Sequence, residues 1–211
     1  MAPSRLTLTR SARALCAFAG AMSLGHEAAA RRALLAARAA GARRPQAEES
    51  ALMLMLYAGY PAALEGLRVL NGAWPGRSRA SDRGTPAEWR VAGERLCARV
   101  YGPAYARLVP AVHALHPDLA TWMIEHGYGR VLSRRGLTAR DRELVTVATL
   151  AALGWPRQLV SHLLGALRVG ATPGQVEAAL VAGARHAGPE ALAAARKEWK
   201  RLHAVRTRVR A

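Results

Sequence analysis

Two side chains in the C-terminal half of the chain have the types and positions that proton transfer requires. His162 lies three residues after Leu159 and four before Ala166, so it shares or borders the inward face of its predicted helix. An imidazole in that position can donate or accept a proton near neutral pH. From position alone, a core histidine that is hydrogen-bonded to backbone or solvent is the simpler interpretation. His162 is therefore a candidate general acid that needs support from elsewhere in the sequence.

Glu143 is the candidate carboxylate partner, at the edge of the apolar face of the preceding predicted helix. If the two helices pack antiparallel through Gly154-Trp155-Pro156, Glu143 lies about 16 Å before the turn and His162 about 9 Å after it. The two side chains would then not be level, and a direct contact would need a tilt or a water. The carboxylate either orients the imidazole and holds a proton, or forms a salt bridge with Arg140 or Arg142.

Further side chains could complete a substrate site. Arg142 and Arg130 could hold a substrate carboxylate, because a guanidinium group binds a carboxylate through two parallel hydrogen bonds. Trp122, Glu125 and His126 could line the same cleft. The alternatives are solvated side chains: the chain has 29 arginines, and an acid and a histidine at a helix end are commonly exposed.

Other reaction classes have little support. Cys16 and Cys97 have no resolving partner nearby in the sequence, and we interpret both as small buried hydrophobic residues. The seven histidines form no recognised ligand motif, since His113-x-x-His116 alone is weak, so no metal site is predicted. Phosphate-binding glycine loops and nucleophile elbows are also absent.

The elements that must position these residues are helices. Alanine and leucine dominate a chain that is 51% hydrophobic and only 5% aromatic, and no segment alternates with period two. Thr138 is expected to cap a helix that ends at Gly154. A second helix follows from Pro156 toward Gly170, and a third covers Pro173–Ala187. The predicted fold class is all-α.

A further helical region is predicted between residues 89 and 135. Pro103, Pro110 and Pro117 are expected to divide it into short helices, because proline lacks the backbone N–H that a helix interior needs. The segment Gly127-Tyr128-Gly129 is expected to interrupt it again.

An internal repeat organises the chain. Leu24-Gly25 corresponds to Leu153-Gly154, and Ala58-Gly59 to Ala187-Gly188, each pair 129 residues apart. The repeat predicts two fused copies of one helical module. The predicted domains are a degenerate N-terminal repeat at 1–70, a linker at 71–88, and a C-terminal domain with a basic tail at 89–211.

The first copy lacks both candidate proton-transfer residues. The positions opposite Glu143 and His162 are Ala14 and Ala33, again at a separation of 129 residues. The first copy is therefore predicted to have lost the site and to serve packing.

The formal charge is +17, from 31 lysines and arginines against 14 acidic residues. Such a charge indicates either an anionic partner or an arginine-rich composition solvated on helix faces. The arginines occur throughout, the only dense cluster is the tail at 196–210, and no nucleic-acid-binding motif accompanies them. We expect a small anionic substrate rather than nucleic acid. A non-catalytic binding or structural protein with a basic tail is an alternative.

The N-terminus has some features of a secretory signal, because arginines precede the apolar stretch Ala14–Leu24. Glycine and polar residues dilute this stretch, and it matches a later part of the repeat, so we expect it to belong to the fold. No apolar run reaches the roughly 18 to 20 residues that span a bilayer. We expect no membrane partner and a cytoplasmic location.

The second copy contains a series of short motifs at fixed positions: Arg140-Asp-Arg142-Glu143-Leu-Val, Ala152-Leu-Gly154, Ser161-His162, Gly165-Ala-Leu and Gln175-Val-Glu177. With these motifs it resembles the carboxymuconolactone decarboxylase family, relatives of the alkylhydroperoxidase-D proteins. The resemblance continues weakly into the first copy. The resemblance implies two fused alkylhydroperoxidase-D-like modules. It also implies an oligomer, with this chain as a prefused dimer that assembles into a ring.

The activity that the resemblance implies is decarboxylation, or a related proton transfer, on a small carboxylated lactone or related acid. No cofactor is required if the substrate's own conjugated carbonyl accepts the electrons. His162 would deliver the proton and Glu143 would tune it, while Trp122 and Trp155 would form apolar walls. Peroxidase members of the family use a Cys-x-x-Cys pair, and the corresponding positions here are Trp155 and Gln158, which disfavours a peroxiredoxin-type antioxidant activity.

Overall fold

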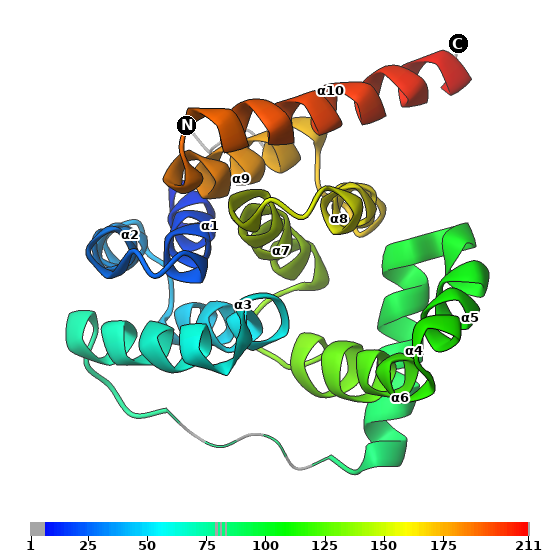
Figure 1. Cartoon of the computed structure of the whole chain (residues 1–211). Helices are drawn as coiled ribbons and strands as arrows, with labels where there is room; N and C mark the ends of the chain where they lie inside the picture. Colours follow the sequence, from blue (N-terminus) through cyan, green and yellow to red (C-terminus); the bar gives the residue numbers. More distant parts are fainter. Residues whose placement is uncertain (1–6, 79, 81, 83, 211) are drawn as a thin grey trace.

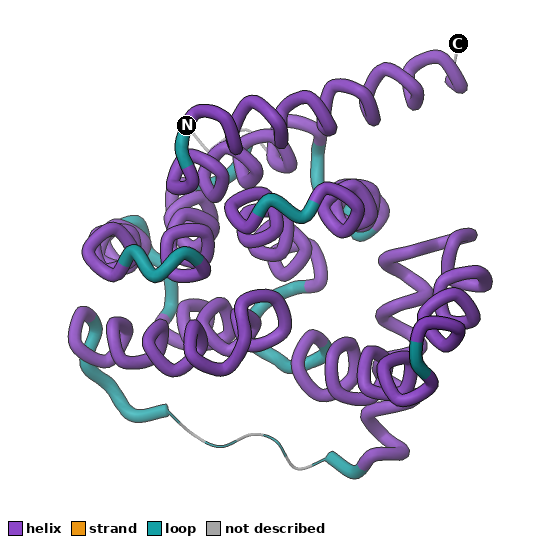
Figure 2. Tube along the Cα trace, viewed as in Figure 1, coloured by secondary structure: helices purple, strands orange, loops and turns teal. Residues whose placement is uncertain are grey.

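The computed structural model describes residues 7–78, 80, 82 and 84–210, with side chains to residue 204. Within these residues the chain forms helices and loops and no strand, which confirms the all-α prediction (Figure 2). The basic tail beyond residue 204 and the outer ends of the predicted domains lie outside the described side chains.

Ten α-helices follow one another along the described chain (Figure 1). They are α1 Arg10–Ser23, α2 Glu27–Ala39, α3 Arg44–Ala73, α4 Pro86–Tyr101, α5 Tyr105–Leu115, α6 Pro117–Trp122, α7 Ala139–Leu153, α8 Pro156–Arg168, α9 Pro173–Ala184 and α10 Pro189–Arg210. Two short 3-10 helices, η1 Gly102–Ala104 and η3 Arg185–Ala187, and a π-helix, η2 Met123–Leu132, complete the set.

Helix α7 lies at the centre of the bundle, packed against α1, α8 and α9 (Figure 1). The side chain of Thr138 accepts a hydrogen bond from the backbone N–H of Asp141 and caps α7, as predicted. Every residue of α7 from Arg142 to Ala152 is buried. Helices α1 and α9 touch through glycines, because a Cβ at Gly20 would lie only 2.5 Å from the Cα of Gly183. Because the middle of α7 is buried, the charged side chains of Arg142 and Glu143 lie inside the core.

Helix positions follow the 129-residue offset. Helices α1, α2 and α3 each begin 129 residues before α7, α8 and α9. The glycines at equivalent places also share their backbone conformation: φ is 72° at both Gly25 and Gly154, and 84° and 99° at Gly59 and Gly188. Gly59 produces a kink inside α3 at the place where Gly188 separates η3 from α10. Descent from a duplicated module and the domain boundaries at 1–70, 71–88 and 89–211 stay predictions.

The helical region predicted between residues 89 and 135 differs from the prediction in two places. Pro110 lies inside α5, where the exposed backbone of this surface helix can bond to water instead. Gly127 and Gly129 lie inside η2 rather than interrupting the helical region. A Cβ at Gly129 would lie 2.0 Å from the carbonyl oxygen of Trp89, so the glycine serves the close packing of η2 on α4.

The apolar stretch Ala14–Leu24 belongs to the fold, as expected. Its residues form most of α1, and Leu15, Phe18 and Met22 are buried in the core. None of the described helices combines the length and the apolarity that a bilayer-spanning helix needs.

Candidate functional site

Helices α7 and α8 bring Glu143 and His162 into direct contact. Nδ1 of His162 lies 2.9 Å from Oε2 of Glu143, and the two residues are only 6% and 3% exposed. Sequence spacing placed the two side chains at different levels. They meet without a water because α8 has no side chain at Gly165, where a Cβ would lie 2.6 Å from the glutamate oxygen. The glycine leaves room for the carboxylate against α8.

The alternative salt bridges of Glu143 are absent from the described residues. Arg140 pairs with Asp141 at 3.0 Å, and Arg142 pairs with Glu49 at 2.9 Å. The carboxylate of Glu143 therefore faces the imidazole, and a buried pair of this kind can orient a histidine and stabilise its protonated form.

The imidazole of His162 lines a pocket of about 390 Å³ between α3, α4, α6 and η2. Both halves of the chain contribute to the lining, and Glu143 lies behind His162 rather than on the pocket wall. Of the residues that the sequence suggested for this cleft, Trp122 and His126 line it. The other lining residues are Met55, Leu56, Tyr57, Tyr60, Tyr101, Leu119, Met123, Gly127, Tyr128 and Leu132. The pocket is mostly apolar, with a few polar groups around the histidine.

Three of the four tyrosines that line the pocket lie close to His162 or to one another. Tyr57 and Tyr101 stand edge-on to the ring of His162, with centroids 6.3 and 6.2 Å away, and Tyr128 stands edge-on to Tyr101. The hydroxyl of Tyr57 lies 2.8 Å from the hydroxyl of Thr146. Burial raises the pKa of each of these three phenols, so they stay neutral O–H donors at physiological pH.

Arg142 does not line this pocket. Its side chain is buried, and its Nη2 lies 2.9 Å from Oε2 of Glu49 and 2.6 Å from the carbonyl oxygen of Arg134. Burial lowers the pKa of Arg142, and its Nε and Nη1 have no hydrogen-bond partner among the described residues. Arg134 also binds the Glu49 carboxylate, at 3.0 Å. Arg142 therefore joins α7 to α3 instead of facing a substrate in the His162 pocket.

The other predicted site residues are also placed elsewhere. Arg130 pairs with Asp82, stacks on the ring of Trp89 at 4.7 Å, and lines a smaller neighbouring pocket. Glu125 binds Arg90 at 2.7 Å. Trp155 is 55% exposed at the turn between α7 and α8 and lines a different pocket. The structure brings His162, Glu143, His126 and Trp122 together, and leaves out Arg142, Arg130, Glu125 and Trp155.

Both thiols are buried and free. Burial, with a smaller contribution from a nearby carboxylate, raises the pKa of Cys16 and of Cys97 to about 12. Across the described parts of the chain, no three His, Cys, Asp or Glu residues cluster in a way that could hold a metal ion.

Comparison with known proteins agrees with the resemblance seen in the sequence. Residues 117–200 match the model of the Carboxymuconolactone decarboxylase family. A stretch of 141 residues is 28% identical to "Peroxisomal protein 2" of Schizosaccharomyces pombe; it covers 64% of this chain and 65% of that protein, just under two thirds of its length. The match at 117–200 contains Glu143, His162 and much of the pocket lining. This region of the chain, which carries the buried pair and opens onto its pocket, is similar to the carboxymuconolactone decarboxylase family.

Proposed function

We propose that the protein catalyses cofactor-free proton transfer, and decarboxylation in particular, on a small carboxylated lactone or related acid. The observation that carries this proposal is the buried Glu143–His162 pair, whose imidazole opens onto a pocket of about 390 Å³. The family of the surrounding region supports the same reaction class.

The residues present can perform each step. When the bond to the carboxylate carbon breaks, carbon dioxide leaves. The electron pair of the broken bond stays on the substrate and is delocalised into its conjugated carbonyl. Protonated His162 then delivers its proton to the resulting carbanion, and Glu143 stabilises the imidazolium until transfer occurs. Apolar walls formed by Trp122, Met123 and Leu132 favour a step in which a carboxylate becomes neutral carbon dioxide.

The developing enolate needs hydrogen-bond donors, and tyrosine hydroxyls are the candidates for this role. Tyr57, Tyr101 and Tyr128 all line the pocket beside His162, and each carries a neutral hydroxyl because burial raises its pKa. Neutral donors fixed in an apolar site stabilise an oxyanion more effectively than water does. This role replaces the arginine anchor that the sequence suggested, since no arginine lines the pocket within the described residues.

The proposal is tested by screening carboxylactones and β-keto acids for released carbon dioxide. We expect at least one of these compounds to be turned over by the wild-type protein and by Trp155→Phe, a variant of an exposed aromatic residue outside the pocket. If no compound releases carbon dioxide faster than it does in buffer, decarboxylation is contradicted.

Removing both thiols is expected to leave the activity unchanged. Thiol catalysis requires a thiolate, and pKa values of about 12 keep Cys16 and Cys97 protonated. A peroxidase cycle would also need a second thiol to resolve the oxidised one, and neither cysteine has a vicinal partner in the sequence. The rate of carbon dioxide release by Cys16→Ala/Cys97→Ala should equal that of the wild type. A thiol-dependent peroxidase turnover that disappears in either single variant would show the opposite mechanism.

A further inference from the structure

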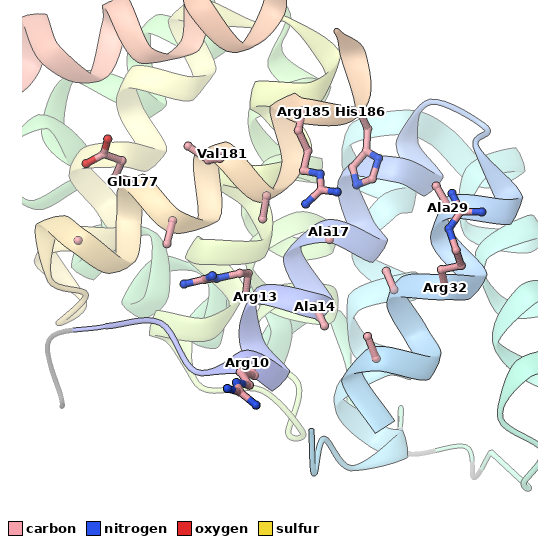
Figure 3. A pocket seen from close by; sticks show the side chains of 15 residues that line it. Arg10, Arg13, Ala14, Ala17, Ala29, Arg32, Glu177, Val181, Arg185 and His186 are labelled. Carbon is pink, nitrogen blue, oxygen red and sulfur yellow. The ribbon is translucent and has the colours of Figure 1, made fainter. Parts of the chain in front are cut away.

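A second pocket, of about 690 Å³, lies between α1, α2, α9 and η3 (Figure 3). Its lining comes from residues 10–36 and from residues 174–186. Lining residues of this pocket lie 129 residues before or after residues of the candidate active site. The pairs are Ala14 with Glu143, Ala33 with His162, Ala17 with Thr146, and His186 with Tyr57.

The first copy was expected to serve packing, and Ala14, Ala17 and Ala33 do pack against the core. They are only partly buried, however, and they also line an open pocket. The small side chains at these positions leave a space there. Without a glutamate and a histidine at these positions, the space can hold a ligand but has no Glu–His pair with which to transfer a proton.

Arginines surround this space. Arg10 and Arg13 come from α1, Arg32 from α2 and Arg185 from η3, and all four line the pocket. None of them forms an ion pair with another described residue, and Glu177 is the one acidic residue in the described lining. Figure 3 shows Arg13 and Arg185 on one side of Ala14 and Ala17, with Arg32 on the other.

His186 also lines this pocket. Its Nε2 is buried and has no hydrogen-bond partner among the described residues. Burial, and then the charges of Arg185, His26 and Arg32, lower the pKa of His186. The four arginines, unpaired among the described residues, give the pocket an excess of positive charge, which a bound anion would relieve.

We propose that this arginine pocket binds a small organic acid, with its carboxylates on the guanidinium groups and its apolar part over the alanines. Guanidinium groups match carboxylates through paired hydrogen bonds, which favours an acid over a neutral ligand. The alanines in the lining offer apolar surface that an organic acid can cover and that inorganic anions cannot. The inference is independent of the proposed activity, because none of the residues that line the arginine pocket lines the pocket at His162.

Binding of trimellitate, a benzene ring with three carboxylates, provides the test by titration calorimetry. We expect Arg32→Gln and Arg13→Gln each to weaken binding by about tenfold, the change that about 1.4 kcal/mol produces. The matched control is Arg31→Gln, which changes the neighbouring exposed arginine of α2 outside the pocket lining and should bind like the wild type. If Arg31→Gln and Arg32→Gln lose affinity for trimellitate equally, the acid is attracted unspecifically to the charged surface, and the proposed site is wrong.

Filling the space tests the pocket without changing its charge. Ala17→Leu and Ala33→Leu each place a larger side chain in the cavity, and both should abolish trimellitate binding while helix content by circular dichroism stays unchanged. His162→Ala should retain the full affinity, which separates this pocket from the candidate active site. Undiminished binding by folded Ala17→Leu and Ala33→Leu, or an affinity for inorganic phosphate equal to that for trimellitate, would contradict an organic acid seated in the pocket.

Discussion

Replacing His162 with alanine is expected to lower the rate of carbon dioxide release by a hundredfold or more, the usual range for the loss of a general acid. Its imidazole lines the pocket and is in direct contact with Glu143. His162→Gln provides the matched variant, because an amide can still hydrogen-bond the carboxylate but cannot deliver a proton at neutral pH. Both variants should lose activity, and circular dichroism should show that both keep the helix content of the wild type.

Glu143→Gln separates positioning from chemistry at the same site. Glu143 contacts the imidazole and does not line the pocket, so its effect on substrate passes through His162. We expect kcat to fall while KM stays unchanged, since the substrate touches the same walls. Activity of His162→Ala equal to that of the wild type would remove His162 from the mechanism, and a rise in KM alone for Glu143→Gln would remove the positioning role.

Glu49→Ala is expected to destabilise the fold by about 3–5 kcal/mol, because it leaves a buried guanidinium without its carboxylate. Arg142 is 2% exposed, and its ion pair with Glu49 joins α7 to α3. Arg142→Met should cost far less. In that variant Glu49 keeps Arg134 at 3.0 Å, and the two guanidinium nitrogens that lack partners are removed together with their desolvation cost.

Urea unfolding of the two variants measures this asymmetry, and the activity of the folded fraction gives a second readout. A structural Arg142 predicts an unchanged KM in Arg142→Met. If KM rises sharply in this variant while its stability stays that of the wild type, Arg142 binds the substrate, as its residue type suggested. Equal destabilisation by the two substitutions would contradict the role of Arg134 as a second partner of Glu49.

Features that depend on neighbours in the sequence could be predicted from the sequence. Thr138 caps α7, and Gly154 ends it, because both effects act within one helical turn. The pairing of Glu143 with His162 could be proposed from residue type and family resemblance. The direct contact between the two side chains could not be predicted, since it depends on how closely α8 approaches α7 at Gly165.

Features that depend on contacts across the chain could not be predicted in this way. Arg142 has the residue type of a substrate anchor, and its partner Glu49 lies 93 residues away. The three tyrosines beside His162 come from α3, α4 and η2, and no spacing in the sequence links them. Gly129 has the residue type of a helix breaker, yet close packing on α4 keeps it inside a π-helix. Tertiary contacts decided each of these cases.

The loop between α3 and α4 lies between two groups of residues that contact each other in the fold or line the pocket together. Tyr57 and Glu49 precede it, while Thr146, Arg142 and His162 follow it. A break of the backbone within this loop would therefore give two fragments, and neither would hold a whole site. The chain thus has the layout that fragment complementation uses, in which a restored pocket reports that two separately made polypeptides have associated.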